Sequence, residues 1–177
     1  MEIFDLFIQK VGKFTYNQDF SPFINKIYNI QKQTKNQFPK SPPEPLQKVG
    51  LQYQTTFNLF KEFPIFKPLQ IYIEENISKF FNNTYLISDS WGNIYKKYGY
   101  VRIHHHGISD ISGVLYLQTP KNSSLIIHDR HDPANSKGVI VNNGDILFFN
   151  GNQPHSTLPN LSDKDKVVIA FNLKINK

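Results

Sequence analysis

The chain has 177 residues, a length that fits one domain of ordinary size. It contains no cysteine, which excludes disulfides, thiolate zinc sites, iron–sulfur clusters and cysteine nucleophiles, so any metal must be bound by His, Asp or Glu. No run of about 18 apolar residues and no basic-then-apolar leader is present. We therefore expect a soluble, cytoplasmic protein without a membrane partner.

The chain carries a net positive charge. The 20 Lys and Arg residues exceed the 14 Asp and Glu residues and give a net charge of +6, an excess that can attract nucleic acid or another polyanion. The basic residues are spread along the whole chain without a long block of like charges, and only two of them are arginines. We do not expect a dedicated nucleic-acid surface, although the charge leaves that class of partner open.

The first half of the chain predicts one strand and two helices. Residues 2–9 are apolar enough for a short strand. A helix is expected over residues 21–35, where Ser21 is a typical N-cap followed by proline, and a second helix over residues 68–82 from its apolar spacing. Residues 39–48 hold four prolines and predict an extended loop.

From residue 84 onward, short β-rich runs recur about every ten residues, separated by Gly, Asn, Asp and Pro. The runs are 84–95, 99–105, 111–118, 124–128, 138–141, 145–149 and 166–173. This spacing, with no helical pattern between the runs, is typical of an antiparallel sandwich or barrel. We expect a mainly β fold with flanking helices, built as a double-sheet jelly roll. It would form a single domain over residues 1–177, with helical support mainly in 1–83 and the jelly-roll core mainly in 84–174.

Three of the six histidines stand together at the end of the expected strand 99–105. Because side chains alternate along a strand, His104 and His106 point to one side and His105 to the other. His155 comes from a distant segment that a jelly roll can bring opposite this strand. Together these three imidazoles would form a facial ligand set, which leaves positions open on a metal and suits non-haem iron oxygenation.

A simpler interpretation of the same residues stays open on spacing alone. The three consecutive histidines would then form a solvated run, and His155 would be a loop residue. For His128 and His131, which lie in a segment rich in turn-forming residues, we favour a surface loop.

Six short motifs occur in a fixed order along the second half of the chain. They are SWGNIY at 90–95, HxH at 104–106, SGVLYL at 112–117, GDILFF at 144–149, His155, and KVVIAFN at 166–172. In this order the motifs resemble those of the 2-oxoglutarate and Fe(II)-dependent oxygenases found in phages and bacteria, strongly over residues 88–172 and faintly upstream. The resemblance implies a double-stranded β-helix (cupin-like jelly roll), an Fe(II) centre and 2-oxoglutarate as co-substrate. A phage-encoded member would act in the host cytoplasm.

The resemblance also implies roles for single residues. His104 corresponds to the first iron ligand and His155 to the distal one. His106 stands where the wider superfamily places the carboxylate of a His-x-Asp pair, which implies either a three-histidine site or a carboxylate from elsewhere, with Asp110 the nearest candidate. We prefer His106 because two residues at i and i+2 on a strand need no rearrangement to share a metal.

The resemblance implies a co-substrate site centred on a lysine, which from the residues alone we would place in a solvated loop. Lys166 takes the place of an arginine that in the superfamily pairs with the distal carboxylate of 2-oxoglutarate, and it supplies charge without a bidentate fork. Val168 stands where a hydroxyl often assists the basic residue, so another donor must replace it. Asn93, Tyr95 and Tyr116 are the candidates.

The resemblance implies a non-haem iron oxygenase that couples oxidative decarboxylation of 2-oxoglutarate to hydroxylation, or a related C–H oxidation, of an unidentified substrate with O₂. Two alternatives stay open. One is a three-histidine, cupin-like dioxygenase that does not use 2-oxoglutarate, and the other is a non-catalytic jelly-roll binding module. Substrate specificity is expected in the loops 39–66 and 128–138, and the sequence gives no indication of the oligomeric state.

Overall fold

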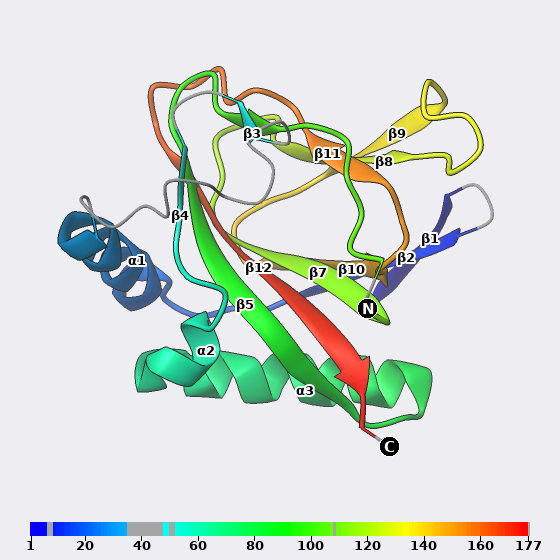
Figure 1. Ribbon diagram of the computed structural model, residues 1–177, viewed down its shortest axis with the longest axis horizontal. Coiled ribbons are helices and arrows are strands. Elements are labelled where there is room, and N and C mark those ends of the chain that lie inside the picture. Colours follow the sequence, from blue (N-terminus) through cyan, green and yellow to red (C-terminus); the bar gives the residue numbers. More distant parts are fainter. Residues whose placement is uncertain (7–8, 35–47, 50–51, 108, 177) are drawn as a thin grey trace.

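The computed structural model describes residues 1–6, 9–34, 48–49, 52–107 and 109–176 (Figure 1). Residues 39–47 of the expected proline-rich loop lie outside these ranges. None of the helices in the described part of the chain is long and apolar enough to cross a membrane.

The main sheet has seven strands, and each pairs with its neighbours in antiparallel fashion. In spatial order they are β1 (Glu2–Leu6), β2 (Gln9–Thr15), β10 (Asp145–Asn150), β7 (Ile111–Gln118), β12 (Lys166–Ile175), β5 (Tyr85–Tyr95) and β4 (Gln52–Gln54). The predicted strands at 84–95, 111–118, 145–149 and 166–173 are thereby confirmed.

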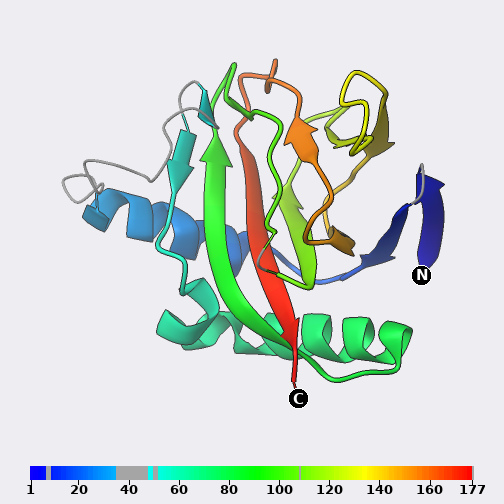
Figure 2. The ribbon, with the colours of Figure 1, turned by 45° about the vertical axis from the view of Figure 1, so that its right-hand side comes forward.

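A smaller layer faces the main sheet (Figure 2). It contains the three-stranded sheet β11 (His155–Thr157), β8 (Ser124–His128) and β9 (Ser136–Ile140), and the pair β3 (Lys48–Val49) and β6 (Tyr100–Val101). A single antiparallel bridge between His104 and His155 connects the chain after β6 to β11. Two layers of antiparallel strands with flanking helices make the expected jelly roll.

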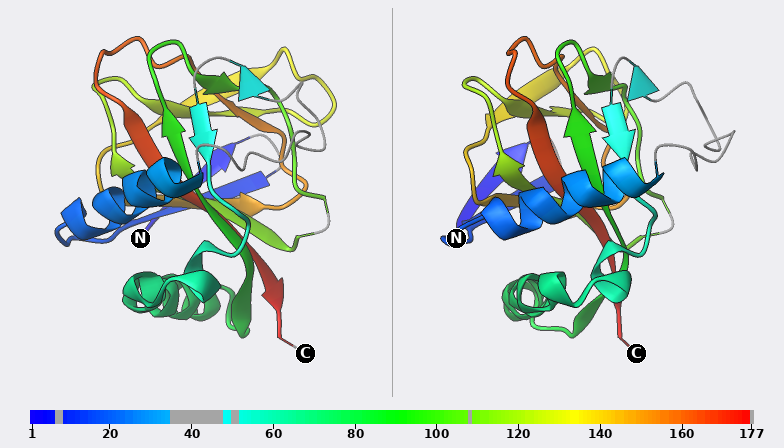
Figure 3. Two further views of the ribbon diagram at one scale, coloured as in Figure 1. Left: turned by 60° about the vertical axis from the view of Figure 1, so that its left-hand side comes forward. Right: turned by 90° about the vertical axis from the view of Figure 1, so that its left-hand side faces the viewer.

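The helices are α1 (Ser21–Thr34), α2 (Leu59–Glu62), the 3₁₀ helix η1 (Pro64–Phe66) and α3 (Lys67–Phe81). The two long helices agree with the sequence prediction, and α1 and α3 lie on the outer face of the main sheet (Figure 3). Asn82 ends α3 in the left-handed conformation, with φ at 52°. An asparagine tolerates this conformation better than most residues, which explains why the helix stops there.

Side-chain alternation along the strands creates two separate cores. One face of the main sheet buries residues such as Ile94, Leu115 and Ile169 against Ile27 of α1 and Ile73 of α3. The opposite face forms a second apolar cluster between the sheets, which includes Tyr95, Tyr116, Phe149, Val168 and, from the smaller layer, Leu125 and Ile127. Neighbouring residues of one strand therefore serve either the helix-side core or the space between the sheets.

Two strand predictions need correction. The run expected as one strand over residues 2–9 belongs to two strands, because β1 ends at Leu6 and β2 begins at Gln9 and pairs with β10. β2 contains Gly12, where a Cβ would lie 2.0 Å from the Phe148 ring, so its lack of a side chain allows the close pairing with β10. The run 99–105 forms a strand only at Tyr100–Val101. The first 83 residues thus supply strands of the main sheet as well as helices.

Candidate metal centre and adjoining cavity

A cavity of about 620 Å³ lies between the two layers of the jelly roll. Its floor is the inward face of the main sheet, including the alternate residues Lys166, Val168, Ala170 and Asn172 of β12. The three histidines singled out in the sequence, His104, His106 and His155, also line it. The period of two along a strand therefore places a lysine and the residues nearest the histidines on one wall.

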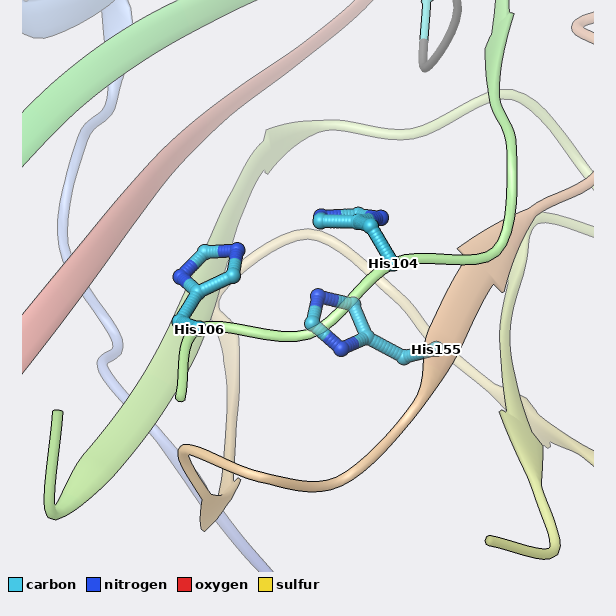
Figure 4. A group of neighbouring side chains, drawn as sticks. All are labelled: His104, His106 and His155. Carbon is cyan, nitrogen blue, oxygen red and sulfur yellow. The ribbon is translucent and has the colours of Figure 1, made fainter. Parts of the chain in front are cut away.

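Backbone pairing brings the histidines together. The His104 N–H donates to the His155 carbonyl at 3.0 Å, and the His155 N–H donates to the His104 carbonyl at 2.9 Å. Residues paired across an antiparallel bridge place their side chains on the same side, and His106 follows two residues later. The potential ligand nitrogens of all three rings lie within 4.8 Å of one another. Figure 4 shows the three rings pointing toward one another from the two segments.

Hydrogen bonds fix the tautomer of each ring. Nδ1 of His104 lies 2.9 Å from the Arg102 carbonyl oxygen, and Nδ1 of His155 lies 2.9 Å from the Gln153 carbonyl oxygen. Because a carbonyl oxygen can only accept, these nitrogens carry the proton, and the lone pair of each ring is on Nε2. Such an arrangement is typical of histidines that bind a metal through Nε2.

His106 is oriented by side chains of the main sheet. Its Nδ1 lies 2.7 Å from Oδ1 of Asn172, and the same oxygen accepts a hydrogen bond from Ser112 at 2.9 Å. Asp110, the alternative to His106 as a ligand, instead accepts a hydrogen bond from the Ile175 backbone N–H at 2.9 Å. The structure therefore joins His106 to the other two histidines and leaves Asp110 outside the group.

Burial lowers the pKa of His155 and so favours its neutral form. His155 is buried, and this burial together with the neighbouring His104 and His106 lowers its pKa well below 6.5. The ring is therefore neutral at physiological pH. Metal binding requires a neutral imidazole, so no proton has to be removed from His155 before a metal binds.

Lys166 brings a positive charge into the same cavity. Its side chain is only 3 % exposed, and its Nζ lies 4.5 Å from the centroid of the Tyr95 ring. Burial lowers the pKa of Lys166 to about 8, and none of the described carboxylates pairs with it. A buried cation without a counter-ion is costly, so this position suits an anionic ligand.

A row of four residues, three of them polar, crosses the cavity floor next to Lys166. Gln54, Asn93, Val168 and Tyr116 are cross-strand neighbours on β4, β5, β12 and β7. Among the described residues, the Gln54 and Asn93 side-chain oxygens and the Tyr116 hydroxyl have no hydrogen-bond partner although they are buried. Burial also raises the pKa of Tyr116, so its phenol stays protonated and can donate. Unpaired buried groups facing one cavity favour a polar ligand there.

Comparisons with known proteins agree with this chemistry. Residues 89–142 match the family described as "Putative 2OG-Fe(II) oxygenase". The match covers the segment from β5 through β9, which includes His104 and His106. A search of curated proteins found no match.

Several solved structures share the fold at low sequence identity. The viral collagen prolyl hydroxylase of Paramecium bursaria Chlorella virus-1, solved with 2-oxoglutarate, has a TM-score of 0.64 at 15 % identity, with 92 % of this chain and 94 % of that chain covered. The carbocyclase SnoK from nogalamycin biosynthesis has a TM-score of 0.72 at 10 % identity, with 95 % of this chain and 80 % of that chain covered. HygX from Streptomyces hygroscopicus, solved with nickel, 2-oxoglutarate and hygromycin B, has a TM-score of 0.65 at 14 % identity, with 92 % of this chain and 82 % of that chain covered.

Within this 2OG-Fe(II) oxygenase fold, one histidine differs from the sequence expectation. His128 is not in a surface loop, because it ends β8 and is buried, with Nε2 2.8 Å from Ser156 Oγ and Nδ1 2.9 Å from the Pro133 carbonyl. The turn-forming residues begin only after His128, so the expected loop wrongly included the last residue of β8. His131 is exposed, as expected.

Sequence reasoning missed several residues that support the site. Gln54 lies near proline-rich sequence that gave no strand signal, and Asn172 looked like an ordinary strand residue. Gly151 was also missed. Its carbonyl accepts a hydrogen bond from the His106 N–H at 2.7 Å, and a Cβ there would lie 2.1 Å from the Ser109 carbonyl oxygen. The missing side chain allows the loop after β10 to approach the histidine segment closely.

Proposed function

We propose that this oxygenase is a hydroxylase that binds Fe(II) through His104, His106 and His155 and 2-oxoglutarate beside Lys166. The observation that carries the proposal is the convergence of three imidazoles from two remote segments in a cavity that also holds a buried lysine, with which none of the described carboxylates pairs. Three neutral nitrogen donors on one side of a metal fit Fe(II) and leave the opposite positions for ligands.

When bound, the iron and 2-oxoglutarate supply the oxidising chemistry, with O₂ as oxidant, for attack on a C–H bond of the primary substrate. The residues of the chain hold and orient these groups. The carbonyls of Arg102 and Gln153 and the Asn172 side chain keep the three rings in the tautomer that presents Nε2.

The far end of the cavity would bind the distal carboxylate of 2-oxoglutarate. Lys166 provides the charge, the Tyr116 hydroxyl a hydrogen bond, and Asn93 an amide on the same row. Tyr95 packs its ring against the ammonium and keeps water from it. These contacts position the co-substrate for reaction.

Metal binding tests the ligand set. Untagged protein should bind one Ni(II) or Fe(II) per chain, and His104→Ala and His155→Ala should each abolish stoichiometric binding. His131→Ala, which removes an exposed histidine outside the cavity, is the matched control and should bind metal like the wild type. Metal binding by His155→Ala equal to that of the control would contradict the assignment.

Turnover tests the reaction. With Fe(II) and O₂, the wild type should convert 2-oxoglutarate to succinate, and the histidine variants should not. Oxygen uptake that does not depend on added 2-oxoglutarate would instead indicate the three-histidine dioxygenase. Transfer of one oxygen atom from labelled O₂ to a C–H position of an accepted substrate would establish hydroxylation.

A further inference from the structure

The described residues that line the cavity include cationic and neutral side chains but no carboxylate. Among the described residues that line it, four are histidines and one is a lysine, and none is an Asp or a Glu. A cavity of this composition has no anionic side chain to offset a bound cation.

The acidic residues nearest in sequence to the site are bound elsewhere. Asp165 precedes Lys166, but its carboxylate lies 2.6 Å from the Tyr28 hydroxyl and 2.5 Å from Lys96 Nζ. Asp110 follows the histidine segment and accepts a hydrogen bond from a backbone N–H of β12. Neither carboxylate lines the cavity.

The net charge of the occupied cavity is the sum of the charges of its side chains, the metal and 2-oxoglutarate. This sum rests on the proposed function. A divalent metal held by three neutral imidazoles keeps both of its positive charges, and Lys166 adds a third. Bound 2-oxoglutarate brings two negative charges, so one positive charge remains uncompensated. A carboxylate at the position of His106 would have cancelled it.

We infer that the primary substrate of this enzyme carries an anionic group, such as a carboxylate or a phosphate, that enters the cavity near the histidine cluster. At an effective dielectric constant of about 20, two unit charges about 6 Å apart change a dissociation constant by about 100-fold. An anion is therefore strongly favoured over a neutral molecule of the same shape, and a cationic substrate is disfavoured.

The walls near the cluster define the rest of the substrate. Trp91 lies with its ring centroid 5.6 Å from that of His106, and Phe57, half exposed, contacts the edge of Trp91 at 5.2 Å. Phe149 packs 4.7 Å from the His155 ring. These rings suit an apolar body, so the substrate combines an apolar part with an anionic group.

The probes are acetate and acetamide, which have nearly the same shape and differ in charge. Calorimetric titration of each into Ni(II)-loaded protein saturated with 2-oxoglutarate should show acetate binding at least tenfold more tightly than acetamide. His106→Asp, which adds a carboxylate at the cluster, should weaken acetate about 100-fold and leave acetamide unchanged. Gln54→Glu adds a nearly isosteric charge to the cavity wall on the row beside Lys166 and away from the three histidines. Once its saturation with 2-oxoglutarate has been verified by titration, this variant should weaken acetate in the same direction if His106→Asp fails to fold or to hold the metal.

Three results would overturn the inference: equal binding of the two probes, acetate binding insensitive to both added carboxylates, or acetate affinity that falls in proportion to 2-oxoglutarate concentration. The last result would place acetate in the co-substrate site. If nickel or 2-oxoglutarate itself does not bind, the proposed function fails first, so the two failures are distinguishable.

Discussion

The buried ammonium of Lys166 should destabilise the metal-free protein while serving the co-substrate. Burial lowers its pKa from 10.5 to about 8, which corresponds to a cost of about 3 kcal/mol at neutral pH. Lys166→Met keeps much of the shape and removes the charge. The contact of the ammonium with the Tyr95 ring, worth about 1 kcal/mol, is lost as well. We therefore expect the free energy of unfolding to rise by about 2 kcal/mol at pH 7.

The pH dependence provides a signature of this cost. At pH 7 the lysine is charged in both the folded and unfolded states, so the full cost is present. Between pH 8 and 10.5 the folded protein releases the proton while the unfolded chain keeps it, so wild-type stability rises through this window. Because Lys166→Met has no such group, its advantage should shrink with rising pH and be nearly gone near pH 10.5, where the folded wild type holds a neutral amine.

Urea unfolding of both proteins at several pH values, without metal or 2-oxoglutarate, measures this difference. Lys174→Met is the matched control, because this lysine is exposed on the same strand, and its stability at pH 7 should equal that of the wild type. Calorimetry on Ni(II)-loaded protein should show 2-oxoglutarate binding weakened roughly 10- to 150-fold in Lys166→Met, the value of a charge-assisted hydrogen bond. A variant less stable than the wild type at pH 7, or one with unchanged 2-oxoglutarate affinity, would refute the reasoning.

Three further substitutions test the supporting contacts. Asn172→Ala removes the acceptor that orients His106 and should weaken Ni(II) binding roughly 10- to 100-fold in a calorimetric titration, whereas Asn172→Asp keeps an acceptor oxygen and should restore binding. Gly151→Ala forces a Cβ against a backbone carbonyl 2.1 Å away and should lower the free energy of unfolding by about 2 kcal/mol, while Gly138→Ala, whose nearest atom is at 3.4 Å, should be neutral; equal losses would contradict this. Tyr116→Phe removes a buried hydroxyl that has no partner among the described residues, so chemical unfolding should show unchanged or slightly higher stability, and 2-oxoglutarate should bind more weakly; unchanged affinity would remove Tyr116 from the co-substrate site.

Local patterns determined much of the fold. The helix α3 follows from apolar spacing and ends at an asparagine, and the bounds of β7 and β8 agree with the predicted runs 111–118 and 124–128. These features depend on interactions between residues close in sequence, which a periodic pattern records. The positions of His104 and His106 depend instead on remote pairing, because both lie beyond β6 and their backbones bond to His155 and Gly151.

Other features depended on pairing between remote segments. β11 is three residues long and β2 contains two lysines and a glycine, so neither has a clear strand pattern, and both form only because a partner strand is present. The burial of His128 likewise comes from contacts with a strand nearly thirty residues away.

The spacing of residues in the sequence selected two alternating histidines and a distant third as candidate metal ligands, and the family resemblance added Lys166 as a candidate for binding an anion. Only the tertiary structure decided that they share one cavity, that Asp110 is bound elsewhere, and that Gln54 and Asn172 complete the walls. The physical reason is that alternation fixes the face of a strand on which a residue lies, whereas the register between strands far apart in sequence is set by the packing of the whole barrel.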